Sequence, residues 1–81
     1  LIGTIKTPYE ALVQAFGAPG RGDGQKVQCE WSIKQGGESE PPVVATIYDW
    51  KQYAEPHTIT EWHVGGYDSR AVALVREILG I

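Results

Sequence analysis

Apolar and polar residues alternate along the chain between positions 27 and 34. The odd-numbered side chains are apolar and the even-numbered ones polar: Val27, Cys29, Trp31 and Ile33 against Gln28, Glu30, Ser32 and Lys34. Because successive side chains of a strand point to opposite faces, this pattern predicts a strand with one buried face. We expect Trp31 to lie on that buried face.

Two later segments also predict strands. Val43 to Trp50 is rich in β-branched and aromatic residues, and neither side of it is plainly polar: Val43, Ala45 and Ile47 against Val44, Thr46, Tyr48 and Trp50. This favours a central strand, or one whose outer aromatic face a partner or ligand covers. The third strand spans Ile59 to Val64, where Thr60, Trp62 and Val64 alternate with Ile59, Glu61 and His63. Gly65-Gly66 ends it.

Two segments predict amphipathic helices. Thr7 is the expected cap of the first, with Pro8 at its first position and Glu10 completing a capping box, and this helix should run to about Phe16 before Gly17. The second begins after Asp68 or Ser69 and ends at Gly80. Its inner stripe is expected to contain Val72, Val75, Ile78 and Leu79.

Short connections favour pairing of strands that follow one another, so we expect an α+β fold in one domain, residues 1–81. The predicted order is helix, three-stranded antiparallel meander, helix, with both helices packed on one sheet face. Residues 1–6 are either an edge strand or a flexible start.

Composition narrows the class of protein. The chain has 81 residues, a net charge of −3 and seven scattered Lys and Arg, which argues against binding of a nucleic-acid duplex by a broad basic surface. A single cysteine and the lack of a long apolar stretch favour the cytoplasm and no membrane contact. Because the chain begins at Leu1, we expect a segment before it. The small core leaves a homodimer as an open alternative.

No group of residues has the spacing of a catalytic triad, a metal site or a carboxylate pair. The titratable candidates are Cys29, Glu30, Asp49, His57, Glu61 and His63. We therefore expect no catalytic residues, no metal and no cofactor. Arg21-Gly22-Asp23 spells an adhesion tripeptide, which we interpret as a chance match.

The first candidate binding site is the junction of the third strand and the second helix. Trp62, His63, Gly65 and Gly66 lead into the helix start, where free N–H groups and Arg70 could hold an anion. The alternative is that the glycines only make the turn and that Trp62 belongs to the core.

The second candidate site combines aromatic and basic side chains. Tyr48, Trp50 and Lys51 lie at the end of the second strand, and pairing with the third strand would bring Trp50 and Trp62 onto one sheet near Arg70. Two aromatic faces beside two cations would suit a planar, anionic nucleotide. The alternative is that the tryptophans are core residues.

Four segments together resemble a family of small uncharacterised proteins encoded by tailed bacteriophages. They are Thr7-Pro8-Tyr9-Glu10-Ala11-Leu12-Val13, Phe16-Gly17-Ala18-Pro19, Thr46-Ile47-Tyr48-Asp49-Trp50-Lys51 and Trp62-His63-Val64-Gly65-Gly66. The resemblance carries no established activity or binding residue. It implies an accessory factor that acts by binding, a class that includes inhibitors of host defence.

Our leading hypothesis is thus a non-enzymatic bacteriophage accessory protein in the host cytoplasm, an anti-defence inhibitor that occupies a host protein through the aromatic sheet face. The first alternative is a sponge for a small nucleotide signal. The second is a structural or virion-assembly component.

Overall fold

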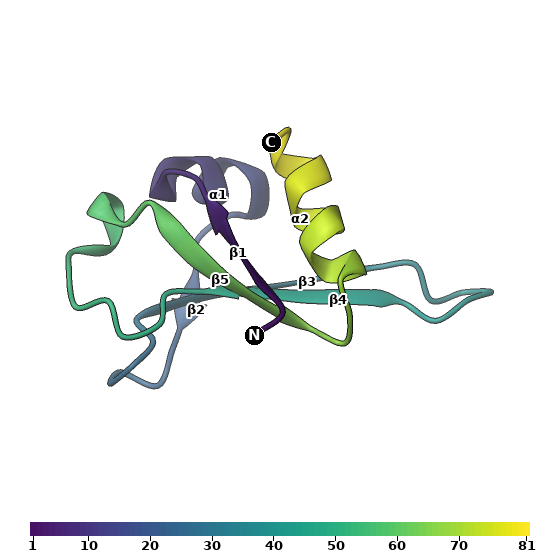
Figure 1. The fold of residues 1–81 in the computed structure, drawn as a ribbon, viewed down its shortest axis with the longest axis horizontal. Helices are drawn as coiled ribbons and strands as arrows, with labels where there is room; N and C mark the ends of the chain where they lie inside the picture. The colour runs from purple at the N-terminus through teal and green to yellow at the C-terminus, as the bar shows by residue number, and fades with distance from the viewer.

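A computed structural model describes all 81 residues and shows a five-stranded antiparallel sheet with two helices (Figure 1). The elements in chain order are β1 Gly3–Lys6, α1 Tyr9–Phe16, β2 Gly20–Arg21, β3 Cys29–Gln35, β4 Val43–Tyr48, the short 3₁₀ helix η1 Pro56–Thr58, β5 Glu61–Gly66 and α2 Arg70–Leu79.

The sheet order is β1-β5-β4-β3-β2, so the expectation of a three-stranded meander is wrong. β3, β4 and β5 do form a meander, but a strand is added at each edge. β1 pairs with β5 from Gly3 opposite Val64 to Lys6 opposite Glu61, and the two residues of β2 pair with the start of β3. The meander prediction failed because it assumed only pairs between neighbours in sequence, whereas β1 pairs with a strand almost sixty positions away.

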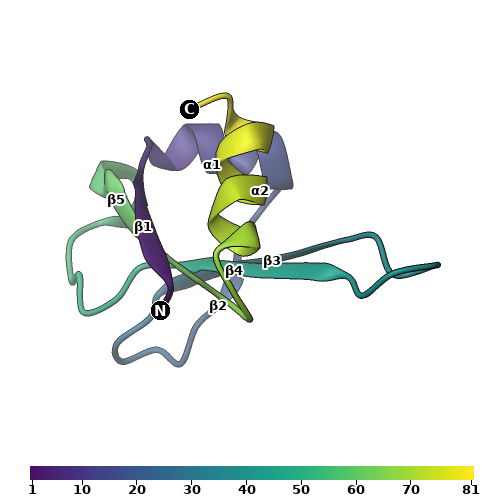
Figure 2. The ribbon, with the colours of Figure 1, turned by 45° about the vertical axis from the view of Figure 1, so that its right-hand side comes forward.

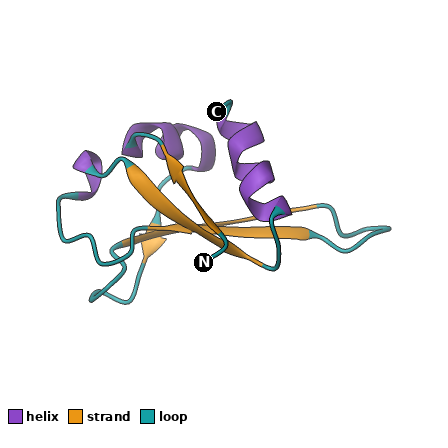
Figure 3. Cartoon of the chain, viewed as in Figure 1, coloured by secondary structure: helices purple, strands orange, loops and turns teal.

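Both helices lie on the same side of the sheet, and the other side carries no helix (Figures 2 and 3). The hydrophobic core fills the space between helices and sheet. Register sets which side chains enter it, since Trp31 lies opposite Ile47 and Ile47 lies opposite Val64. The core therefore takes odd-numbered residues from β3 and β4 but even-numbered residues from β5.

Two buried tryptophans hold α1 at both of its ends. Trp62 donates its indole N–H to the carbonyl of Thr7, just before the helix, and Trp31 donates to the carbonyl of Gly17, just after it, each at 2.9 Å. The two indoles contact each other edge to face, with their ring centroids 5.4 Å apart, and the Tyr9 ring packs against both. Buried aromatic N–H groups normally need such partners, so these bonds fix the position of α1 over the sheet.

The start of α1 differs from the expected capping box. The helix begins at Tyr9, and the residue before it, Pro8, makes no side-chain cap. Thr7 instead continues the line of β1, because its N–H donates to the carbonyl of Thr60. The end agrees with expectation: the helix stops at Phe16, and Gly17 follows with a φ of +88°.

Three of the four residues expected in the inner stripe of α2 do pack against the core: Val72, Val75 and Leu79. Ala71, Leu74 and Val75 are buried, while Ile78 is 46 % exposed. The start of α2 rests directly on Gly66, because a Cβ there would lie 2.7 Å from the Cβ of Ala71. Neither α1 nor α2 has the length and apolar composition needed to cross a membrane.

β3 and β4 extend beyond the helices as a hairpin arm (Figure 1). The connection between them, residues 36–42, contains Gly36 and Gly37 with positive φ and the exposed carboxylates Glu38 and Glu40. The acidic end of the molecule is thus at the tip of this arm.

Replacing Trp62 by phenylalanine is expected to lower the free energy of unfolding by about 2 kcal/mol, because the carbonyl of Thr7 loses its partner and a small cavity remains. Urea unfolding followed by circular dichroism measures this, and Trp31→Phe should have an effect of similar size. Trp50→Phe, at an exposed site, is the matched control and should change stability by less than about 0.5 kcal/mol. Equal effects at positions 62 and 50 would contradict the role given to the indole bonds.

Candidate functional site

The sheet side without helices, called here the open face, displays the alternate residues of four strands. They are Thr4 and Lys6 of β1, Glu61, His63 and Gly65 of β5, Val44, Thr46 and Tyr48 of β4, and Glu30, Ser32 and Lys34 of β3. None of these residues is fully buried. The open face is therefore the largest part of the sheet that a partner could contact.

Tyr48 lies at the centre of the aromatic part of the open face. The centroid of its ring lies 5.6 Å from that of His63, across the strand pair, and 6.4 Å from that of Trp50. Both contacts are edge to face. Gly65 lies beside the Tyr48 ring, since a Cβ there would be in ordinary van der Waals contact with its edge at 3.6 Å. Cross-strand contacts of this kind hold the rings in place on the sheet surface.

Trp50 is the accessible tryptophan of the chain, with 39 % of its surface exposed. The ammonium group of Lys26 lies 5.6 Å from the indole centroid, and that of Lys51 lies 5.7 Å from it. Each exposed cation–π contact contributes about 0.5–1 kcal/mol. We call Lys26, Trp50 and Lys51 the Trp50 cluster.

The backbone holds the two lysines of the Trp50 cluster together. The N–H of Lys51 donates to the carbonyl of Lys26 at 2.8 Å, which ties the loop before β3 to the loop after β4. Lys51 has a φ of +54°, and it is the one residue other than glycine with a positive φ. A side chain in this left-handed region costs about 1 kcal/mol relative to the ordinary helical region.

Asp49 fixes the chain immediately before Trp50. Its carboxylate is fully buried, and one oxygen accepts the backbone N–H groups of Gln28 at 2.8 Å and Cys29 at 2.9 Å. The Gln28 side-chain amide donates to the other oxygen and to the carbonyls of Gln52 and Ala54. Burial, and then the charge of Asp49, raises the pKa of the Cys29 thiol, which therefore stays protonated.

Asp23 organises the loop that carries Lys26. One of its carboxylate oxygens accepts the backbone N–H groups of Gln25, Lys26 and Val27 at 2.8 to 3.0 Å. The bond from Val27, followed by the other two, lowers the pKa of the carboxyl group below its ordinary value. The carboxylate of the Arg-Gly-Asp tripeptide thus has a structural role within its own loop.

The structure brings together some of the residues expected at the binding site and separates others. Five lie together at the aromatic end of the open face: Tyr48, Trp50, Lys51, His63 and Gly65. Trp62 is fully buried on the opposite side of the sheet and cannot stack with a ligand beside Trp50. The idea of two tryptophan faces in one site therefore needs correction. The cause is register: even-numbered residues point outward in β4 and inward in β5.

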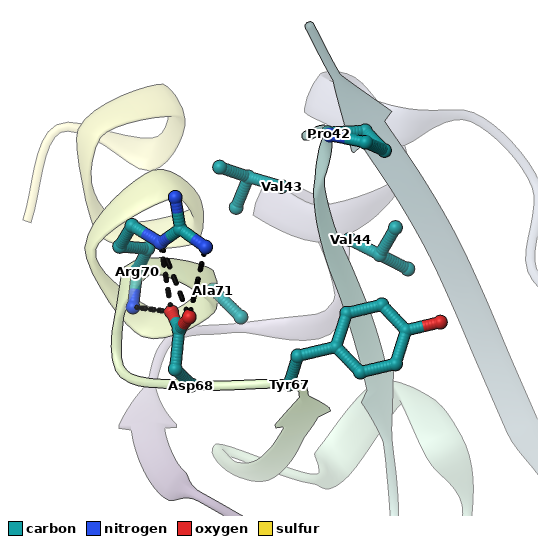
Figure 4. Close-up of a pocket in the computed structure, with 7 residues that line it drawn as sticks. All are labelled: Pro42, Val43, Val44, Tyr67, Asp68, Arg70 and Ala71. Atoms are coloured by element: carbon teal, nitrogen blue, oxygen red, sulfur yellow. Dashed lines mark hydrogen bonds and ion pairs between the residues drawn. The ribbon is translucent and has the colours of Figure 1, made fainter. Parts of the chain in front are cut away.

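Gly66 and Arg70 lie at the other end of β4, about 20 Å along the strand from Trp50. Arg70 forms a two-pronged ion pair with Asp68 beside a recess of only about 10 Å³, enough for about one water molecule (Figure 4). The side chain of Arg70 lowers the pKa of Asp68. The carboxylate of Asp68 also accepts the Arg70 backbone N–H, so it already occupies the helix start where an anion was expected.

Sequence reasoning missed Lys26 and the structural roles of Asp23 and Asp49. Nothing in the sequence relates Lys26 to Trp50, because a loop-to-loop contact across 24 positions leaves no local pattern. Asp49 does have a signal: a carboxylate directly after the apolar run of β4 would be buried at a high cost unless several N–H groups surrounded it.

No group of three His, Cys, Asp or Glu side chains is placed to hold a metal ion. Searches of protein-family models, curated proteins and solved structures found no match to the chain.

Replacing Asp49 by alanine is expected to lower the free energy of unfolding by about 3 kcal/mol, because two buried backbone N–H groups lose their acceptor. Asp49→Asn keeps an oxygen for these groups and should cost less. Chemical denaturation gives the stabilities, and the NMR shift of the Trp50 indole N–H reports whether the loop has moved. A variant Asp49→Ala as stable as the parent would contradict the capping role.

The loop around Asp23 is expected to loosen only in strong acid. Its carboxyl pKa is lower in the folded chain than the ordinary 3.8, so its contribution is complete above that value and is lost as the pH falls through the lowered one. NMR titration of the Gln25, Lys26 and Val27 amides should give a midpoint below 3.8. Asp23→Asn should abolish this titration, and a midpoint above the ordinary value would argue against the loop structure.

Proposed function

We propose that this chain is a non-enzymatic binding protein that occupies a macromolecular partner through the open face. The observation that carries the proposal is the Trp50 cluster. An indole remains exposed just beyond the end of β4, the central strand, while the other two tryptophans are buried. Large, rigid aromatic side chains provide much contact area at a low entropy cost, which is why they are enriched at binding surfaces.

The architecture supports such a role. Both helices pack on one side and stabilise the sheet from there, so the rings of Tyr48, Trp50 and His63 can change partners without disturbing the core. A site on strands is held more rigidly than one on loops alone. From the resemblance to bacteriophage proteins, we further propose that the chain is an accessory factor that acts in a host cell and inhibits host defence.

A sponge for a small nucleotide signal is the second candidate, favoured by the two ammonium groups beside Trp50. Such a site would lack two of the residues expected in it, because Trp62 and Arg70 lie elsewhere in the structure. A single nucleotide would be stacked on one side only. Small-molecule sites generally bury most of their ligand, so this geometry favours a larger partner that covers the open face.

A photo-cross-linking residue tests the proposal. Benzoylphenylalanine at Ser32, on the open face, should form an adduct with a macromolecule from a bacterial extract, and adding Trp50→Ala should abolish it. The same residue at Ala73, exposed on α2, is the control for non-specific capture. Adducts of equal yield at both positions, or adducts indifferent to Trp50→Ala, would refute the open face as the binding surface.

A further inference from the structure

We propose that the Trp50 cluster binds single-stranded nucleic acid. A base stacks on the exposed indole, and the ammonium groups of Lys26 and Lys51 contact the phosphates on either side of that base. This inference rests on the proposed function, because it assigns a partner to the same surface.

The chemistry of the Trp50 cluster matches this ligand better than it matches a protein. Every base presents a flat π-face, and stacking on tryptophan beside basic groups is the common way to bind single strands without reading their sequence. Lysine makes point-charge contacts to phosphate, whereas the centres of protein interfaces are depleted in lysine and enriched in arginine. Here both cations that adjoin the accessible indole are lysines.

The backbone of Lys51 provides a second, independent observation. A left-handed φ of +54° strains any residue with a side chain, and glycine would adopt it freely. The chain nevertheless has a lysine here, and its ammonium group lies beside the indole. Strain of this kind persists where a side chain is needed in one place, so it indicates that the Lys51 cation has a function.

The shape of the site favours an extended single strand over a duplex or a free nucleotide. Trp50 is 39 % exposed, and the rings of Tyr48 and His63 continue the aromatic surface beside it. A duplex hides the faces of its bases from such a platform. Glu30 lies opposite Tyr48, and Glu61 lies two residues before His63, so both carboxylates are at the same end of the open face as the Trp50 cluster. Only the phosphates beside Lys26 and Lys51 are therefore neutralised.

The first test uses the purified full chain and two labelled probes, a twelve-nucleotide oligo-dT and an oligo-rU of equal length. Fluorescence anisotropy should show binding at low salt. With two phosphates neutralised, the logarithm of the association constant should fall against the logarithm of salt concentration with a slope of about −1.4. A duplex of the same length and the mononucleotides UMP and AMP should bind far more weakly.

Variants then locate the contact. Trp50→Ala should weaken oligo-dT binding about 5- to 150-fold. Lys51→Gly and Lys51→Ala should weaken it equally and reduce the salt slope to about −0.7. The thermal midpoint of the glycine variant should lie about 4 °C above that of the alanine variant, because both lose the cation–π contact and only glycine relieves the left-handed strain. Tyr67→Ala and Arg76→Ala, exposed away from the cluster, should bind as the parent does.

Several results would overturn the inference. Oligonucleotides that fail to bind at low salt, or that bind Trp50→Ala as tightly as the parent, would remove it. So would UMP or AMP binding as tightly as the oligonucleotide. If a protease-sensitive, nuclease-resistant adduct still forms at Ser32 in a Trp50-dependent way, the partner is a protein and only the ligand assignment falls. If no such adduct forms either, the open face loses its proposed function as well.

Discussion

The rest of the fold depends on the two buried indoles, which pack against each other and donate hydrogen bonds to the chain on either side of α1. Trp31 and Trp62 come from β3 and β5 and meet edge to face on the helix side of the sheet. Their N–H groups satisfy the carbonyls that flank α1, so one aromatic contact positions a helix of only eight residues. A helix this short has little stability of its own in water. Both helices lie on one side of the sheet, and the opposite side carries no helix.

Asp49 marks the boundary between the strand that belongs to the core and the loop that carries the site. Its carboxylate completes the hydrogen bonding at the start of β3, where no strand residue of β4 is left to do so. The next two residues, Trp50 and Lys51, then turn out onto the surface. The amide of Gln28 fastens the far side of the same loop. The hydrogen bonds of this buried carboxylate thus hold the surface loop in one conformation.

The sequence pattern predicted the elements that are long and regular and failed where pairing is distant. Strict alternation identified the buried face of β3, and Gly17 and Gly80 ended the helices as expected. The two residues of β2 are too few for any period. The sequence also could not predict which tryptophan is exposed. Trp50 and Trp62 both follow a two-residue alternation, and only the register of β4 against β5 places one outward and the other in the core.

The distribution of charge makes a net charge of −3 compatible with the proposed binding of single-stranded nucleic acid. Glu38 and Glu40 lie at the tip of the hairpin arm, and more than the length of β4 separates them from Trp50, about 25 Å along the chain direction. At physiological ionic strength charges are screened over about 8 Å, so the acidic tip acts little on a ligand held beside Lys26 and Lys51. A bound phosphate experiences the local charges, which are the two lysines together with Glu30 and Glu61 at the same end of the sheet. Total charge therefore argues against a broad basic surface, as a duplex requires, and leaves a small cationic and aromatic site unaffected.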